Sequence, residues 1–280
     1  MLTRKKMPVV TTTKNLESIQ IIEWPTPKVL AFSTTRLKPN PHLLFESLSK
    51  NISHNARRTD KSFDYFNLGA HVGDDLEHVS NNRNALLKFL PNGTKIQWLE
   101  QVHGSHVAHI NSHIEQAIVA DAAITRHKNI ALAIMTADCL PILLADKNGY
   151  EIAAIHAGWR PLAANIIKNT VCKMQTPAKD LCAWLGPCIG STAFEVGEEV
   201  KQAFAQISEE FIPAFLPLMN EDNKPKYLAD IAMIAKIQLQ NLGIANISHT
   251  YNCTFTEHDK YYSFRRDGKT GRMASIISLI

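Results

Sequence analysis

Three residues in the middle of the chain carry side chains that can bind a metal ion or act as nucleophiles. They are His103 in the segment WLEQVHG, Cys139 in MTADCLP and His156 in AAIHAGW. Each lies where an apolar segment with strand character meets glycine or proline, a position at which functional side chains are commonly exposed. Two imidazoles and one thiolate match the ligands of catalytic zinc sites, which leave a fourth position open for water or substrate.

The spacing of these residues leaves two other interpretations open. Their separations are far longer than the compact intervals of zinc fingers, so spacing alone does not select a metal. In the first interpretation, Cys139 is a small buried residue beside two structural histidines and binds no metal. Alternatively, Cys139 would act as a nucleophile, with His156 as its base and Asp138 or another polar group orienting the base. What separates these interpretations is whether His103 converges on the thiolate.

The segment after His156 has features of an anion-binding turn. Gly158 precedes a helix that we expect to start near Pro161, so unpaired backbone N–H groups would point toward the three residues. Arg160 lies in the same turn, and its planar guanidinium suits forked contacts to phosphate or carboxylate. Four other arginines, which taken singly would be ordinary surface charges, are candidates of the same kind: Arg36, Arg83, Arg265 and Arg266.

The composition is that of an ordinary globular protein. The 280 residues are 45% hydrophobic and 20% charged, and the net charge of +4 is scattered rather than gathered in a nucleic-acid-binding patch. Five cysteines without a CxxC pair are typical of a reducing compartment. No segment reaches the roughly 18 apolar residues of a membrane span, and the N-terminus lacks a signal-peptide core. We therefore expect a cytoplasmic monomer that binds a small molecule and neither nucleic acid nor membrane.

The elements that position the three residues follow from the hydrophobic pattern. Residues 1–22 read as a polar tail before a single domain over residues 23–280. Strands are predicted over residues 29–34, 95–102, 106–110, 130–136, 141–145, 151–157, 181–185, 247–251, 261–264 and 273–279. Helices are predicted over residues 75–90, 161–174, 196–207 and 228–242, and a long polar loop with a short helix over residues 37–66. Because no regular βαβ order appears, the pattern favours a layered α+β fold.

A series of motifs runs in a fixed order from about Val29 to Ile280. The motifs are NLGAHVGDD followed by NNR, then WLEQVHG, MTADCLP, AAIHAGWR, WLGPCIGSTAFEVGEEV, YLADI and CTFTEHDKYYSFRRDGKTGRMAS. Together they closely resemble the laccase-domain family. Its members are described as multicopper polyphenol oxidases, purine nucleoside phosphorylases or peptidoglycan editing factors.

The resemblance implies a zinc site and a fold. The family's ligands are the His of QVHG, the Cys of DCLP and the His of HAGW, which correspond to His103, Cys139 and His156. The implied fold is a layered α/β/β/α sandwich with mixed sheets, similar to that of cysteine hydrolases. The implied activities are phosphorolysis of adenosine, inosine and methylthioadenosine to the free base and ribose 1-phosphate or its methylthio analogue, and deamination of adenosine to inosine. The HxE and PCxxC signature of zinc deaminases is absent, so a proton-transfer partner would be Asp138 or Glu100.

The same motifs supply the remaining candidate residues. The family commonly has a short glycine-rich loop after its STR motif, whereas here a long polar insert follows Arg36 up to Asn67, which puts substrate contacts from that loop in doubt. The predicted catalytic residues are Cys139, His156 and Asp138. The predicted substrate-binding residues are Arg36, Asn67, His71, Arg83, Gln101, Arg160 and Arg265.

Three other functions stay open at this point. An amidohydrolase that edits a cytoplasmic peptidoglycan precursor would use the same Cys/His site on an amide. A polyphenol oxidase would use copper, but the several HxH-type clusters of a blue site and a trinuclear centre are missing, so one copper at this site would be adventitious. A non-catalytic ligand-binding protein would show affinity without turnover.

Overall fold

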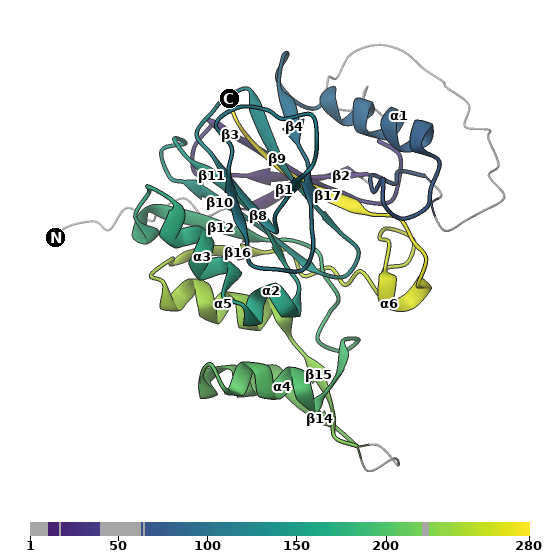
Figure 1. Ribbon diagram of the computed structural model, residues 1–280, viewed down its shortest axis with the longest axis vertical. Coiled ribbons are helices and arrows are strands. Elements are labelled where there is room, and N and C mark those ends of the chain that lie inside the picture. Colours follow the sequence, from purple (N-terminus) through teal and green to yellow (C-terminus); the bar gives the residue numbers. More distant parts are fainter. Residues whose placement is uncertain (1–10, 17, 40–62, 64, 220–223) are drawn as a thin grey trace.

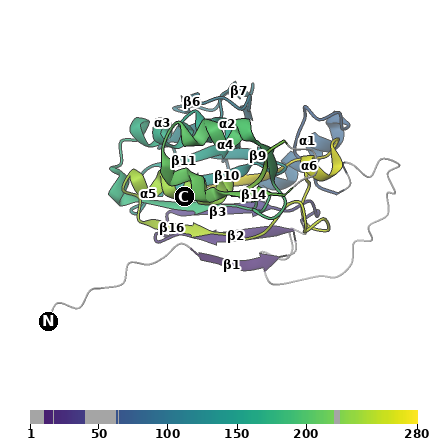
Figure 2. The same cartoon turned by 90° about the horizontal axis from the view of Figure 1, so that it is seen from below.

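The computed structural model describes residues 11–16, 18–39, 63, 65–219 and 224–280. Its first sheet is six-stranded, and its strands β1, β2 and β3 lie side by side along one side of the molecule (Figure 2). Neighbouring strands are antiparallel except for the parallel pair β4 and β9. The strand order is β1 (Thr11–Leu16), β2 (Ile19–Glu23), β3 (Val29–Thr34), β17 (Met273–Leu279), β9 (Ile130–Thr136) and β4 (Lys95–Gln97).

The second sheet is also six-stranded and mixed. Its two edge strands run parallel to their neighbours, and its central pairs are antiparallel. The strand order is β16 (Asn246–His249), β12 (Leu181–Leu185), β10 (Leu140–Asp146), β11 (Ile152–Ala157), β8 (Ala122–Thr125) and β6 (Val107–His109). Strands β10 and β11 are buried at every position, as expected of strands covered on both faces.

Helices cover the outer faces of both sheets (Figure 1). Helix α1 (Leu76–Leu87) packs on the first sheet through Leu86, while α2 (Trp159–Ala163), α3 (Ile166–Lys173), α4 (Glu198–Ala205) and α5 (Ile231–Asn241) contribute to a separate apolar core on the second sheet. A third core, which includes Leu132 and Trp184, lies between the two sheets. The predicted α+β fold with α/β/β/α layers is therefore confirmed.

Smaller elements complete the described chain. Helix α4 and a three-stranded sheet lie together at the bottom of Figure 1. The sheet contains β13 (Glu195–Gly197), β15 (Lys226–Ala229) and β14 (Phe215–Leu218). Strands β5 (Leu99–Glu100) and β7 (Ile118–Val119) form a short parallel pair, and α6 (Phe264–Asp267) is one helical turn near the C-terminus. None of the described helices combines the length and the apolar character needed to cross a membrane.

Several predicted elements are confirmed and others are wrong. The predicted helix over residues 161–174 is two helices, because Asn165 has a left-handed φ of 60° that ends α2 and starts α3. The predicted strand over residues 261–264 is absent, since Tyr261 and Tyr262 are buried in a loop that leads into α6. The aromatic residues that suggested a strand instead fill space in the core.

The prediction of a polar tail over residues 1–22 is wrong for the residues of that range that the structure describes. Residues 11–16 and 19–23 pair as an antiparallel hairpin, and β2 continues the sheet by pairing with β3. Ile19 and Ile22 are buried in that sheet, which gives the strand its apolar anchor. Ile19 and Ile22 pack into different cores, so the short isoleucine-rich run Ile19–Ile22, rather than strict alternation, is the signal that identifies this strand. The predicted loop over residues 37–66 falls mostly outside the described residues.

The core between the sheets generates a test of the layered packing. Leu132 is fully buried there, and Leu132→Ala removes apolar contacts and leaves a cavity. We expect the free energy of unfolding to fall by about 2–5 kcal/mol, measured by urea denaturation. Leu76→Ala is the matched control, because Leu76 on α1 is 66% exposed and the same change should cost less than about 0.5 kcal/mol. Equal losses for the two variants would contradict the described packing.

Candidate metal centre

The three residues first identified in the sequence come together in space. One ligand atom from each of His103, Cys139 and His156 lies within 4.8 Å of the others. Cys139 Sγ is 3.7 Å from His103 Nε2, and the two imidazole rings stand nearly edge to face with centroids 4.7 Å apart. The described residues contain no second group of three or more such side chains gathered this closely.

The ligands are presented at the edge where the chain passes from one sheet to the other. Cys139 lies in the tight turn between β9 of the first sheet and β10 of the second, and His156 lies near the end of β11, which pairs with β10. His103 follows β5. His103 and Asp138 both have left-handed backbone, with φ of 58° and 99°. Such conformations are unfavourable for these residues and mark places where the structure fixes a side chain for function.

Asp121 holds two of the three ligands. Its carboxylate accepts hydrogen bonds from the backbone N–H groups of His103 (2.9 Å) and Gly104 (2.7 Å) and from Nδ1 of His156 (2.8 Å). Its carbonyl also accepts the backbone N–H of His156 at 2.7 Å. Because Nδ1 of His156 donates to Asp121, its Nε2 lone pair is left for a metal ion or a proton. Asp121 is fully buried, and these bonds outweigh burial and lower its pKa, so it is ionised.

The electrostatics of the group favour a thiolate. Burial alone would raise the pKa of Cys139, but the charge of His156 and the hydrogen bond from His103 outweigh it and lower the pKa. Burial would lower the pKa of His156, yet the neighbouring thiolate and Asp121 raise it. The thiolate is the form in which cysteine ligates metals and attacks electrophiles.

Gly158 allows the ligands to approach each other. A Cβ atom at this position would lie 2.8 Å from Cys139 Sγ and 3.5 Å from Cδ2 of His103. Any side chain there would push on the thiolate. The glycine of the HAGW segment is therefore required by close packing around the sulfur.

The donor set fits a single metal ion. Two imidazole nitrogens and one thiolate converge from three sides, one imidazole is oriented by a buried carboxylate, and a cavity occupies the remaining side. This combination is that of a catalytic site with an open coordination position rather than of a closed structural site. All three side chains line the cavity; His156 is buried and His103 is exposed, so the centre is open to solvent at His103.

The cavity has a volume of about 300 Å³ and two chemically different ends. One end is formed where the first sheet finishes and carries His71, Gln101 and Arg272. The remaining lining residues, called here the aromatic end, are largely aromatic and aliphatic and include two arginines. The aromatic end includes Trp159, Arg160, Ile189, Phe194, Phe264 and Arg265.

Asp138 lines the cavity, but its carboxylate is committed to the protein. One oxygen accepts from Thr254 Oγ1 and the other from the backbone N–H of Arg265, each at 2.7 Å. The sequence named Asp138 or another polar group as the residue that orients His156, and in the structure that residue is Asp121, not Asp138. Asp138 instead joins the turn before Cys139 to the C-terminal segment. Glu100, the other proposed proton carrier, is not among the residues that line the cavity.

Gln101 also faces the cavity while serving the fold. Its side-chain amide donates to the carbonyl of Met135 and accepts from the N–H of Met135, both at 2.8 Å. This pair fixes the end of β9 against the segment that carries His103. Of the predicted substrate-binding residues, the structure places His71, Gln101, Arg160 and Arg265 on the cavity wall.

Three other predicted substrate-binding residues do not line the cavity. Arg36 donates to the carbonyl of His258 and lies over the ring of Tyr262. Arg83 stacks on Trp98 at 4.0 Å and donates to a backbone carbonyl. Asn67 is fully buried and bonded to neighbouring groups through its side chain. Sequence could not separate these polar residues from those of the cavity, because all of them belong to the same motifs.

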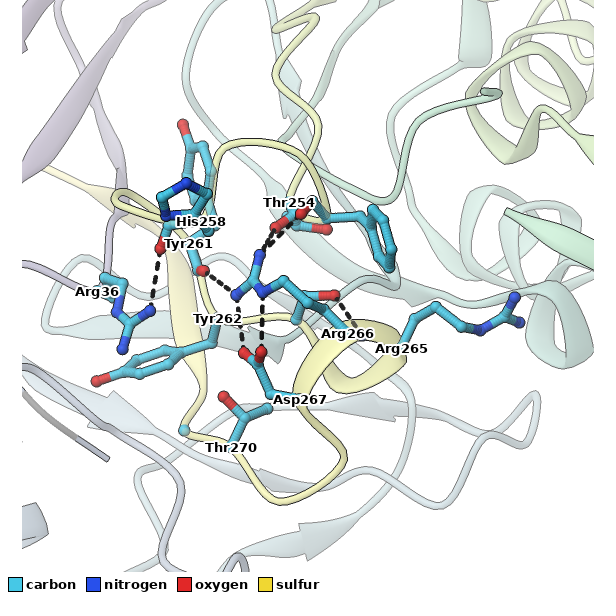
Figure 3. A network of polar contacts seen from close by, with 12 residues as sticks. Arg36, Thr254, His258, Tyr261, Tyr262, Arg265, Arg266, Asp267 and Thr270 are labelled. Atoms are coloured by element: carbon cyan, nitrogen blue, oxygen red, sulfur yellow. Dashed lines mark hydrogen bonds and ion pairs between the residues drawn. The ribbon is translucent and has the colours of Figure 1, made fainter. Parts of the chain in front are cut away.

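The C-terminal segment is held at the cavity by Arg266 (Figure 3). Its guanidinium donates to the carbonyls of Thr254, Phe255 and Tyr261 and forms a forked ion pair with Asp267. Arg265, which points away from this network, donates to the carbonyl of Glu195. Arg266 therefore organises the loop that presents its neighbours to the cavity.

Sequence reasoning missed the aromatic residues of the cavity wall, Trp159, Phe194 and Phe264, and two charged residues of the site, Asp121 and Arg272. Asp121 follows a short apolar run in VADAAI, and no spacing rule connects it with His156. Arg272 looked like one of many scattered cations, although its place directly before the last strand was a usable signal. Both are identified by three-dimensional contacts.

The fold and the site define an α+β protein with one His-Cys-His group able to hold a metal ion. Residues 53–280 match the family described as multi-copper polyphenol oxidoreductase laccase, and the chain belongs to this family. It is 39% identical over 266 residues to "Purine nucleoside phosphorylase YfiH" of Escherichia coli (strain K12), covering 95% of this chain and 100% of the relative. It is 42% identical over 217 residues to "Purine nucleoside phosphorylase PA4543" of Pseudomonas aeruginosa, covering 78% and 87%.

Solved structures share the whole fold. The Neisseria meningitidis protein NMB0706 is similar with a TM-score of 0.80 and 35% identity, covering 94% of this chain and 99% of that one. YlmD from Geobacillus stearothermophilus is similar with a TM-score of 0.79 and 25% identity, covering 97% and 99%. The family resemblance inferred from the motifs is thus confirmed.

The contacts of Asp121 predict its effect on metal binding. Asp121→Asn replaces one acceptor oxygen by a donor that cannot serve the N–H groups of His103, Gly104 or His156. We expect metal affinity, measured by competition with a chromophoric chelator, to fall about 10–100-fold. Asp180→Asn, at a surface ion pair with Lys147, is the control and should leave the affinity unchanged. An unchanged affinity in a folded Asp121→Asn protein would show that the carboxylate does not support the ligands.

Proposed function

We propose that this protein is a zinc-dependent purine nucleoside phosphorylase that acts on adenosine, inosine and methylthioadenosine and also deaminates adenosine to inosine. The observation that carries the proposal is a cavity in which the His-Cys-His group, an aromatic end and guanidinium groups meet. Its volume lies at the lower end of the range typical of small-molecule sites. The names of the relatives in Escherichia coli and Pseudomonas aeruginosa support the same reaction class.

The aromatic end suits a purine base. Trp159 is covered by Arg160 at 4.4 Å and Phe194 by Arg265 at 5.1 Å. Phe264 is 60% exposed at the cavity wall, and no ring or cation of the described chain stacks on it. Its free face can stack on a flat heterocycle. The arginines at this end and Arg272 at the other end supply positive charge for an anionic co-substrate.

The residues around the metal position act by holding groups in place. Asp121 keeps His156 in the tautomer whose Nε2 faces the centre, and Gln101 fixes the end of β9 next to His103. A zinc ion bound by this group would supply a Lewis acid that polarises a substrate oxygen or nitrogen. Zinc suits the proposal better than copper because the described part of the chain brings together only one such ligand group, whereas multicopper oxidation needs several.

Turnover with and without phosphate tests the reaction. We expect inosine to give hypoxanthine and ribose 1-phosphate only when phosphate is present, and adenosine to give inosine without it, both followed by chromatography. Metal analysis of the purified protein should give about one zinc per chain. His103→Ala and His156→Ala should each lower turnover at least about 100-fold, because a Lewis acid contributes several kcal/mol. No turnover by a protein that holds one zinc per chain would refute the proposal.

A second candidate rests on the contact between Asp121 and His156. Cys139, His156 and Asp121 are arranged as nucleophile, base and orienting acid, so the thiolate could attack an amide as in a peptidoglycan-precursor editing hydrolase. His103 distinguishes the two candidates, since a cysteine nucleophile does not need it. Activity that survives His103→Ala in metal-free protein would favour the nucleophile.

The cytoplasmic location and the monomeric state stay predictions.

A further inference from the structure

A cationic side chain without an acidic partner lines the polar end of the cavity. The guanidinium of Arg272 is partly buried, and no carboxylate in the described residues lies within ion-pairing distance of it. One of its amino groups donates to the carbonyls of Thr270 and Gly271 at 2.9 Å. Its other N–H groups bond to nothing else in the described part of the chain. The charges of Cys139 and Asp138 lie near enough to favour the charged guanidinium, but neither forms an ion pair with it, so an anionic ligand would further compensate this partly buried charge.

The backbone of Arg272 is fixed by a turn that is distant in sequence. Asn67 Oδ1 accepts from the N–H of Arg272 at 2.8 Å and from the N–H of Gly69 at 2.9 Å, and the N–H of Leu68 donates to the carbonyl of Arg272 at 3.1 Å. A Cβ at Gly69 would lie 2.8 Å from Cγ of Arg272, so the turn packs directly on the arginine stem. The backbone and the aliphatic stem of Arg272 are therefore fixed by this turn, which in turn positions the guanidinium.

The same turn carries a second polar group to this end of the cavity. His71 lines the cavity beside Arg272, and burial together with the charges of Arg272 and Arg83 lowers its pKa. A neutral imidazole offers one N–H donor without adding charge repulsion to the arginine. Met273, which follows Arg272, pairs with Thr136 at the end of β9. This places the polar end next to the turn that carries Cys139.

We propose that Arg272, together with His71, forms an oxyanion site that binds inorganic phosphate for nucleoside cleavage. This inference rests on the proposed function and deepens it. The bound phosphate would face the metal centre from the polar end, while the base lies toward Phe264. A phosphate oxygen would then bond to C1′ as the bond from C1′ to the base breaks. The electron pair leaves with the base, which gains the proton that phosphate loses.

The other arginines of the cavity are less suited to this role. Arg160 lies over the ring of Trp159, and Arg265 is exposed and donates to the carbonyl of Glu195. Exposed guanidinium groups are screened by water and salt, whereas a partly buried one binds an anion more strongly. A planar guanidinium with free N–H groups can form a forked contact with two phosphate oxygens.

The test compares direct phosphate binding with kinetics in the zinc-loaded, full-length protein. Inorganic phosphate is titrated by calorimetry in the absence of nucleoside, and the KM values for phosphate and for inosine are measured separately. In Arg272→Gln we expect phosphate affinity to fall about 10–100-fold and the KM for phosphate to rise in parallel. The KM for inosine and the zinc content should change less than about twofold. Arg126→Gln, which removes a surface charge outside the cavity, is the control.

Each outcome decides the inference separately from the proposed function. Phosphate binding that disappears in Arg272→Gln supports the oxyanion site even when the unchanged protein cleaves no nucleoside, in which case the proposed function fails alone. Unchanged phosphate affinity in Arg272→Gln overturns the inference. A loss of zinc without a change in phosphate affinity also overturns it, since the guanidinium would then act by stabilising the Cys139 thiolate that binds the metal. If Arg272→Gln does not fold, Arg272→Lys keeps the charge but loses the fork. Its phosphate affinity should fall at least about threefold, and wild-type affinity would overturn the inference.

Discussion

The buried carboxylate of Asp121 is the constraint on which the metal centre depends. Two ligands arrive on segments that do not pair with each other, one on the loop after β5 and one on β11, and Asp121 bonds to both. His103 has a left-handed φ, a conformation that histidine adopts at a cost of about 1–3 kcal/mol. The hydrogen bonds that Asp121 accepts from His103 and Gly104 offset this cost. An ionised carboxylate is stable in this buried place only because every one of its partners is a donor.

A second carboxylate, that of Asp138, fixes the turn before Cys139 to the C-terminal segment. Asp138, also in a left-handed conformation, binds Thr254 and the backbone of Arg265 and so attaches the C-terminal segment to the turn before Cys139. Arg266 then fixes that segment through three carbonyls. The cavity therefore has one wall from the sheets and one from a loop, and hydrogen bonds of charged side chains, together with the packing of Tyr261 and Tyr262 on Met273, hold the two in place. The hydrogen bonds are directional, which gives the cavity walls a defined geometry.

The sequence predicted the core of the fold well because the buried strands are almost purely apolar. Strands β9, β12 and β17 begin and end where the pattern placed them, since each is predominantly apolar; β17 is interrupted only by Ser275 and Ser278. The hairpin of β1 and β2 was missed because its polar context hides two buried isoleucines. The pattern also could not show that residues 261–264 form a loop, because aromatic residues favour strands and also fill cores. Local patterns report burial, but they do not report which partner buries a residue.

The same limit explains which parts of the candidate site the sequence could predict. The ligand positions were identified by motif, and the structure brings the three side chains together, whereas the roles of polar neighbours depend on contacts across the chain. Asn67 and Arg272 illustrate this point, since they are separated by most of the sequence and meet through one hydrogen bond from the backbone N–H of Arg272 to the side-chain Oδ1 of Asn67. Asn67 looked like a substrate contact but supports the backbone of Arg272, and Arg272 looked like surface charge but faces the cavity. A site of this kind is organised before any ligand binds, because its strained and charged residues are held by the fold. Little reorganisation would then accompany binding of the proposed anion and flat ring, because the bonds that fix the cavity walls are already formed.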